Sequence, residues 1–213
     1  MEFLPDLGTF IAFTIAVWIL ALTPGPDMTI SIARALSDGK VGGLMVVLGT
    51  STGLVVHTLL VALGVSALII ASPTAFLVLK TGGAAYLVWL AIQAIRYGSS
   101  FTVRRESGPQ RSAAANYLSG LWVNLLNPKV IIFFMTFLPQ FVTADDPHVT
   151  GKLIFLGLWA ICIGMPVNAV IVLIAERLSM WLQNNRAVLR GIDYTFAGVF
   201  SLFAVKIFMT QAR

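Results

Sequence analysis

Residues 41–79 read VGGLMVVLGTSTGLVVHTLLVALGVSALIIASPTAFLVL and include no Asp, Glu, Lys or Arg. A helix needs about 20 apolar residues to cross the hydrocarbon core of a bilayer, so this stretch is too long for one crossing. Ser72 and Pro73 interrupt it, because proline cannot continue a helix from the preceding turn. We therefore predict two membrane spans here, at about residues 41–70 and 73–97.

The rest of the chain has the same apolar character. Of its 213 residues, 58% are hydrophobic and 11% are charged, against about 25% charged in soluble domains. A soluble domain of this size could not cover so much apolar surface, which excludes an ordinary cytosolic enzyme, a disordered chain and a disulfide scaffold. We predict an all-α integral membrane protein with six spans. The other four are expected at about residues 7–36, 113–141, 153–175 and 189–210.

The basic residues predict how the chain is oriented. Nine of the 14 Lys and Arg lie in the predicted loops after the first, third and fifth spans, four lie on the other side, and Lys129 lies within a span. Basic loops favour the cytoplasm. We expect a multi-pass protein of the bacterial inner membrane with both termini in the periplasm. These topology signals account for the net charge of +5 without a nucleic-acid partner.

The spans fall into two similar halves, residues 1–97 and 113–213, joined by a basic cytoplasmic linker at residues 98–112. Each half opens with a span that proline interrupts, at Pro24 and at Pro128. Three spans is an odd number, so the second half must enter the membrane from the opposite side. This predicts an inverted repeat, a design common among secondary transporters. Prolines in phase by chance, or five spans with one re-entrant segment, are the alternatives.

Asp27 is the acidic residue that lies deep within a predicted span. It follows Pro24, Gly25 and Pro26, which break the helix and free its carbonyl groups. Pro26 suits the first position of the helix that resumes, so Asp27 lies in its first turn, where the dipole stabilises an anion. The functional interpretation is that Asp27 binds a substrate ammonium or a coupling proton. The alternative is a helix cap without substrate contact.

Lys129 occupies the matching place in the second half. Asn127 can cap the helix that resumes there, and Pro128 can start it. A lysine in that first turn lies at the unfavourable end of the dipole, so we expect it to need an anion. A substrate carboxylate is one choice, since a helix N-terminus with a cation suits it. A permanent pair with Asp27 is the other.

Other polar residues within predicted spans are candidates for the same cavity. His57 either relays protons or bonds neutrally across helices. Asn124 and Asn168 either line a cavity or join helices, and Thr23 lies at the first break. The sequence contains no phosphate-binding loop and no H-E-x-x-H motif. We therefore expect no ATP hydrolysis, no cofactor and no metal site.

Four motifs together resemble the LysE/RhtB family of bacterial amino-acid exporters. They are LTPGPD at residues 22–27, GGAAYL at 82–87, NLLNPK at 124–129 and FLPQF at 137–141. The resemblance extends over essentially the whole chain. It implies a transporter rather than an enzyme, which exports amino acids such as homoserine, threonine or lysine and is driven by the proton motive force.

These observations combine into one functional hypothesis. The substrate carboxylate meets Lys129 and the helix that begins at Pro128, and the ammonium or an exchanged proton meets Asp27. Proton-coupled antiport follows if Asp27 titrates between the two access states. A cation exporter or channel with Asp27 as ion ligand is the alternative, and a membrane enzyme or small assembly subunit is a third. The sequence leaves a homo-oligomer open.

Overall fold

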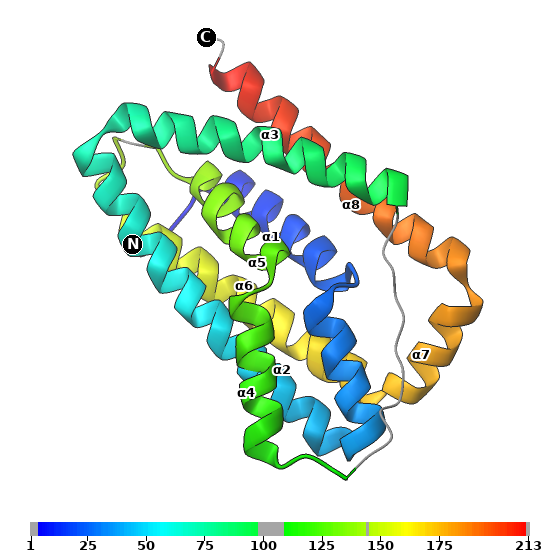
Figure 1. The fold of residues 1–213 in the computed structure, drawn as a ribbon. Coiled ribbons are helices and arrows are strands. Elements are labelled where there is room, and N and C mark those ends of the chain that lie inside the picture. The colour runs from blue at the N-terminus through cyan, green and yellow to red at the C-terminus, as the bar shows by residue number, and fades with distance from the viewer. Residues whose placement is uncertain (1–3, 98–108, 144, 212–213) are drawn as a thin grey trace.

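The computed structural model describes residues 4–97, 109–143 and 145–211, and the regular structure in these ranges is entirely helical. This confirms the predicted all-helical class. The predicted linker at residues 98–112 lies mostly outside the described residues. The elements in chain order are α1 Leu7–Leu22, α2 Pro26–Ala71, α3 Pro73–Tyr97, α4 Ala113–Leu125, α5 Pro128–Ile132, the π-helix η1 Phe133–Phe137, the 3₁₀ helix η2 Leu138–Phe141, α6 Val149–Leu173, α7 Ala175–Asn184 and α8 Arg186–Gln211 (Figure 1).

Several of the described helices suit a membrane. α2, α3 and α6 each contain a stretch that is long and apolar enough to cross a bilayer. α4 and residues 128–141 together form a fourth such segment, bent by 51° at the break between them. α1 is apolar but has only 16 residues. The helices thus fit a membrane protein, while the number of six spans stays a prediction.

Helix α2 is too long to be a single straight crossing. Its 46 residues would extend about 69 Å, more than twice the thickness of the hydrocarbon core. Gly39 breaks it with φ 79° and ψ 175°, a conformation that glycine adopts without a side-chain clash. Residues 26–38 and 40–71 therefore form two legs, which turn back on each other in Figure 1. A turn is predicted from the sequence at this position.

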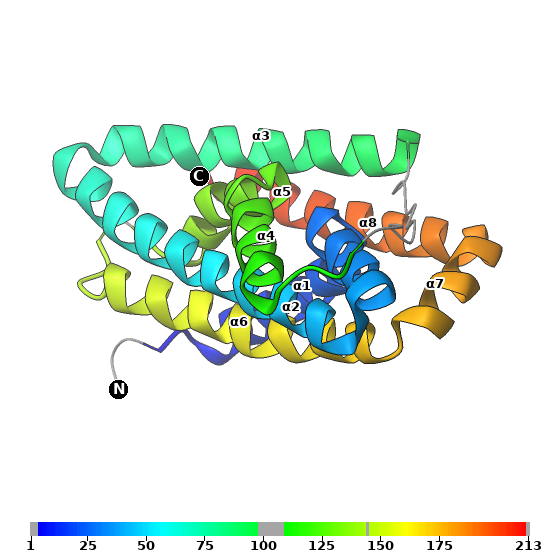
Figure 2. The ribbon, with the colours of Figure 1, turned by 60° about the horizontal axis from the view of Figure 1, so that its bottom comes forward.

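Glycines allow α2 and α4 to approach very closely. A Cβ atom on Gly49 would lie 2.0 Å from the carbonyl oxygen of Tyr117, and one on Gly120 would lie 2.2 Å from that of Val46. No larger residue fits either position, which is the packing that small residues permit between membrane helices. α2 also packs along α6, while α3 and α8 run side by side on one edge (Figures 1 and 2).

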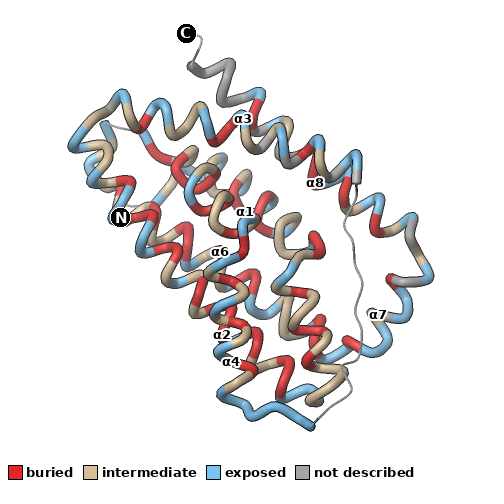
Figure 3. The backbone as a smooth tube through the Cα atoms, in the orientation of Figure 1, coloured by how far each residue is buried: buried red, intermediate tan, exposed pale blue. Residues whose placement is uncertain are grey.

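The main buried core joins α1, the second leg of α2, η1 and α6. Its largest fully buried side chains include Phe13, Phe134, Phe137, Leu153 and Leu156. Figure 3 shows buried positions along α1, α2 and α6. This packing brings the C-terminal end of α1 and the start of α5 together, with α6 alongside.

Candidate functional site

Two interrupted helices meet at the centre of the site. α1 ends at Leu22, Thr23 is extended, and α2 begins at Pro26 after an extended Gly25. α4 ends at Leu125, and α5 begins at Pro128. We call residues 23–25 the first junction and residues 126–127 the second junction. Both resumed helices start with proline followed by a charged residue.

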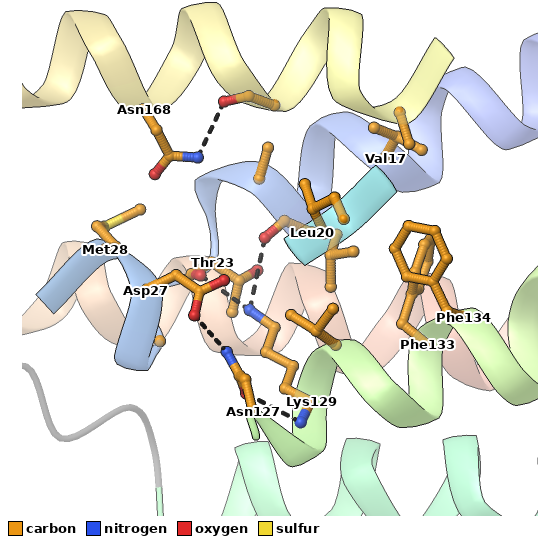
Figure 4. Close-up of a pocket in the computed structure, with 16 residues that line it drawn as sticks. Val17, Leu20, Thr23, Asp27, Met28, Asn127, Lys129, Phe133, Phe134 and Asn168 are labelled. Carbon is orange, nitrogen blue, oxygen red and sulfur yellow. Dashed lines mark hydrogen bonds between the residues drawn. The ribbon is translucent and has the colours of Figure 1, made fainter. Parts of the chain in front are cut away.

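Asp27 receives hydrogen bonds from two asparagine side chains. Nδ2 of Asn124 donates to Oδ2 at 2.6 Å, and Nδ2 of Asn127 donates to Oδ1 at 2.9 Å. Asp27 also lies in the first turn of α2, where the helix dipole favours an anion. Bonds to an ionised carboxylate are stronger than bonds between neutral groups. The carboxylate of the first half is thus held by amides of the second half, and Figure 4 shows the bond from Asn127.

Lys129 is held by main-chain oxygens of the first half. Its Nζ donates to the carbonyl of Thr23 at 2.9 Å and to that of Leu20 at 3.5 Å. These are carbonyls at the C-terminal end of α1, where the dipole favours a cation. The sequence led us to expect an anion as partner; in the described part of the chain no ion pair joins Lys129 to Asp27. The partner of Lys129 is instead the negative, C-terminal end of α1.

Two groups on α8 also lie near Lys129. The Nζ atom lies 5.6 Å from the centre of the Phe196 ring, within the range of a cation–π contact. The buried carboxylate of Asp193 is within electrostatic range of the ammonium. Helix α8 therefore contributes to the surroundings of the lysine.

Asn127 connects the two charged residues. Its Oδ1 accepts from the backbone N–H of Lys129 at 3.0 Å, which makes it the N-cap of α5 and confirms the predicted cap. Its Nδ2 is the group that donates to Asp27. One side chain thus starts the second half-helix and fixes the carboxylate of the first.

A cavity of about 90 Å³ opens beside these groups. A water molecule needs about 10–15 Å³ of cavity volume, so this cavity has room for several water molecules. The predicted residues that line it are Thr23, Gly25, Asp27, Asn127, Lys129 and Asn168. Asn168 lies on α6, and its Nδ2 donates to the carbonyl of Gly164 at 2.9 Å (Figure 4).

The remaining predicted residues lie outside the cavity wall. They are Pro24, Pro26, Asn124, Pro128 and His57. Asn124 still reaches Asp27, and its own Oδ1 is buried without a hydrogen-bond partner. His57 is buried, with Nε2 at 3.4 Å from the carbonyl oxygen of Asn124. His57 therefore contacts Asn124, which in turn binds Asp27.

The structure adds an apolar lining that sequence reasoning missed. It includes Val17, Leu20, Phe133, Phe134 and Gly164. Phe133 opens the π-helical segment η1, and π-helical turns are frequent at functional sites. In the sequence these residues have no signal that separates them from ordinary core residues of a membrane helix.

The comparisons with known proteins find relatives that align with most of the chain. A homoserine/homoserine lactone efflux protein of Salmonella typhimurium is 30% identical over 191 residues, which cover 90% of this chain and 91% of the relative. An uncharacterized membrane protein of Vibrio cholerae is 32% identical over 185 residues, covering 87% and 89%. One of Pseudomonas aeruginosa is 30% identical over 216 residues, covering 96% and 97%. No solved structure matches the chain.

The LysE type translocator family matches residues 18–211, which include both junctions and α6. The match covers nearly all of the described helices, and the efflux proteins among the relatives align along most of their length. The chain therefore belongs to the LysE type translocator family and is a transporter rather than an enzyme.

Proposed function

We propose that the protein exports a small amino acid or a derivative of one, of the homoserine, threonine or lysine type, across a bacterial inner membrane. The observation that carries the proposal is the cavity at the two junctions, which presents one carboxylate and one ammonium. An amino acid in its zwitterionic form carries the complementary pair of charges. The homoserine efflux relatives support both the direction and the substrate class.

The substrate carboxylate binds Lys129 and the amide of Asn127, and its ammonium binds Asp27. In the unloaded site both charged side chains already have partners within the protein. This matters because an unpaired charge away from water costs several kcal/mol. Substrate binding exchanges those internal hydrogen bonds for bonds to the zwitterion, so neither the empty nor the loaded site leaves a charge unsatisfied.

Asp27 is the proton carrier in this mechanism. When the site faces the cytoplasm, the ionised carboxylate binds the substrate ammonium. When it faces the periplasm, substrate leaves and a proton neutralises Asp27 for the return step. A carboxylate buried in a membrane is costly to leave charged and unpaired, so a proton or a cationic group must accompany its movement. The result is antiport of amino acid and proton.

In this mechanism the site changes from cytoplasmic to periplasmic access when the two halves of the chain move against each other. We propose six spans arranged as inverted repeats over residues 1–97 and 113–213, with residues 98–112 and the intervening cytoplasmic loops carrying the basic charge and both termini in the periplasm. The matching starts of α2 and α5, each with proline and then a charged residue, support the repeat. Because the two charged side chains bond across the junctions, rocking of one half changes both sites together.

Transport by the purified full-length protein in proteoliposomes tests the proposal. Labelled homoserine, threonine and lysine are offered with and without an imposed pH gradient. We expect flux above empty vesicles that the gradient accelerates and a protonophore abolishes. Absence of flux for every amino acid would contradict the proposal, and gradient-dependent flux of a divalent cation instead would favour a cation exporter.

A further inference from the structure

The cavity has two chemically different ends. Asp27, Asn127 and Lys129 form one end, at the junctions. Figure 4 shows Val17, Phe133 and Phe134 at the other end, away from Asp27. Leu20, Leu54 and Val130 add further apolar side chains to the cavity wall. A substrate held by its charged groups at the junctions therefore directs its side chain toward an apolar surface.

Helix α6 supplies one wall of the cavity. Ala160, Gly164 and Asn168 lie one turn apart on the same face of α6, and all three line the cavity. Ala160 offers only a methyl group and Gly164 offers no side chain. Between Ala160 and Asn168, α6 therefore presents almost no side-chain volume to the cavity.

Gly164 differs from the other buried glycines in the space around it. A Cβ atom on Gly164 would have nothing within 4 Å, although the residue is buried. A Cβ atom on buried Gly53 would lie 2.4 Å from Asn124 Oδ1. Gly64 and Gly198 also have open space, but they are exposed. The free space at Gly164 is therefore internal, and it belongs to the cavity that this residue lines.

We propose that this wall is the side-chain subsite of the transporter, that Gly164 sets the largest side chain accepted, and that the substrate is an amino acid with an uncharged side chain. The inference rests on the proposed binding of a zwitterion between Asp27 and Lys129. A cationic side chain at the apolar end would be buried without a partner, which disfavours lysine. The open space that a side chain at Gly164 would enter is part of the cavity, so a substitution there takes room from the substrate.

The test uses the full-length protein in proteoliposomes and a graded set of labelled substrates. Alanine, 2-aminobutyrate, norvaline and norleucine differ by one methylene each, and lysine keeps the four side-chain carbons of norleucine and adds a terminal ammonium. Gly164→Val is expected to reduce norleucine transport about tenfold more than alanine transport, in the range that a hydrophobic pocket discriminates. Gly164→Ala is expected to show a smaller effect in the same direction. Ala160→Gly removes a methyl group from the same wall and is expected to favour norleucine relative to alanine.

Gly198→Val is the matched control. It introduces the same side chain at a glycine of α8 that also has open space but lies away from the cavity, and it is expected to leave the substrate order unchanged. Wild-type transport of norleucine at least tenfold faster than lysine is also expected. Thermal unfolding and size-exclusion profiles of each variant show whether a change in transport reflects a change in folding.

The outcomes separate the two proposals. If the wild-type protein transports no amino acid, the proposed function is wrong and the subsite fails with it. If the wild-type protein transports amino acids but Gly164→Val and Gly164→Ala change all substrates equally or none, the subsite alone is wrong. Lysine transport as fast as norleucine transport would overturn the assignment of an uncharged side chain.

Discussion

Both junctions lead into a helix that carries a charged residue in its first turn, but they differ in length, in capping and in the partners that they provide. The first junction is an extended segment in which Gly25 precedes α2 without a side-chain cap. The second junction is shorter, and the Asn127 side chain caps α5. Each charged residue takes its partners from the opposite junction and from the last turn of the helix before it. Asp27 is bound by side-chain amides, whereas Lys129 is bound by main-chain carbonyls.

Because of this difference, a single substitution can remove a hydrogen-bond partner of Asp27 but not a main-chain partner of Lys129. The amide donors to Asp27 belong to Asn124 and Asn127, so each can be removed by one substitution. The acceptors of Lys129 belong to the backbone of α1 and remain whatever side chain occupies those positions. We therefore expect substitutions around Asp27 to alter transport in steps, while the main-chain hydrogen bonds of Lys129 are lost only if the lysine itself is replaced.

The largest effect is expected from Asp27→Asn. The substitution keeps the size of the side chain but removes the charge, and one of the two amide donors loses its acceptor. Both amide bonds to Asp27 lose their charge assistance, and each charge-assisted bond contributes about 1.5–3 kcal/mol, so we expect transport to fall about 100-fold or more. Counterflow in proteoliposomes measures this, with membrane insertion checked by protease protection. Transport at the wild-type rate would remove Asp27 from the mechanism.

Lys129→Met is expected to weaken substrate binding about 10- to 100-fold, through loss of one charge-assisted contact with the substrate carboxylate. Methionine keeps an unbranched side chain that is one atom shorter and uncharged, and it leaves the carbonyls of Leu20 and Thr23 in place. Binding is measured as protection against thermal unfolding by increasing amino-acid concentration. Lys152→Met is the matched control, since Lys152 pairs with Asp146 away from the cavity. Equal affinity in both variants would give Lys129 a purely structural role.

Gly53→Ala is expected to reduce transport about tenfold, although Gly53 does not line the cavity. Its added Cβ would lie 2.4 Å from Oδ1 and 3.0 Å from Cβ of Asn124, so the whole asparagine side chain has to move. Asp27 then loses a charge-assisted donor, a loss of about 1.5 kcal/mol or more. Gly64→Ala, on the same helix but in open space, is the control for transport assays. Equal transport by both variants would show that Asn124 is not needed.

The helical membrane class and the two charged residues follow from the sequence because their signals are local. Long uncharged stretches indicate membrane helices. Pro26 and Pro128 each precede a charged residue within such a stretch, and a charged residue inside the membrane is costly enough to indicate a function. The sequence also predicts the cap formed by Asn127, since asparagine before proline is a common helix start.

The partners of Lys129 and the far end of the cavity could not be predicted in the same way. A backbone carbonyl has no sequence signal, so nothing marks Leu20 or Thr23 as an acceptor for a lysine more than 100 residues away. Phe133, Phe134 and Gly164 are apolar residues among many in membrane helices. Only the three-dimensional packing separates those that face a cavity from those that fill the core.

The smallest effect is expected from Asn127→Ser, which separates the two roles of Asn127. Serine is also a good N-cap, so α5 keeps the acceptor for the Lys129 N–H, but the amide that donates to Asp27 is lost. We expect transport to fall about three- to tenfold with little change in stability, because the bond that is lost is the longer of the two to Asp27 and the shorter bond from Asn124 remains. Ser112→Ala removes the cap of α4, at Ala115 N, without touching the cavity. This control is expected to lose about 1 kcal/mol of stability and to keep its transport rate per folded molecule. Wild-type transport by Asn127→Ser would reduce Asn127 to a helix cap and leave Asn124 as the donor on which Asp27 depends.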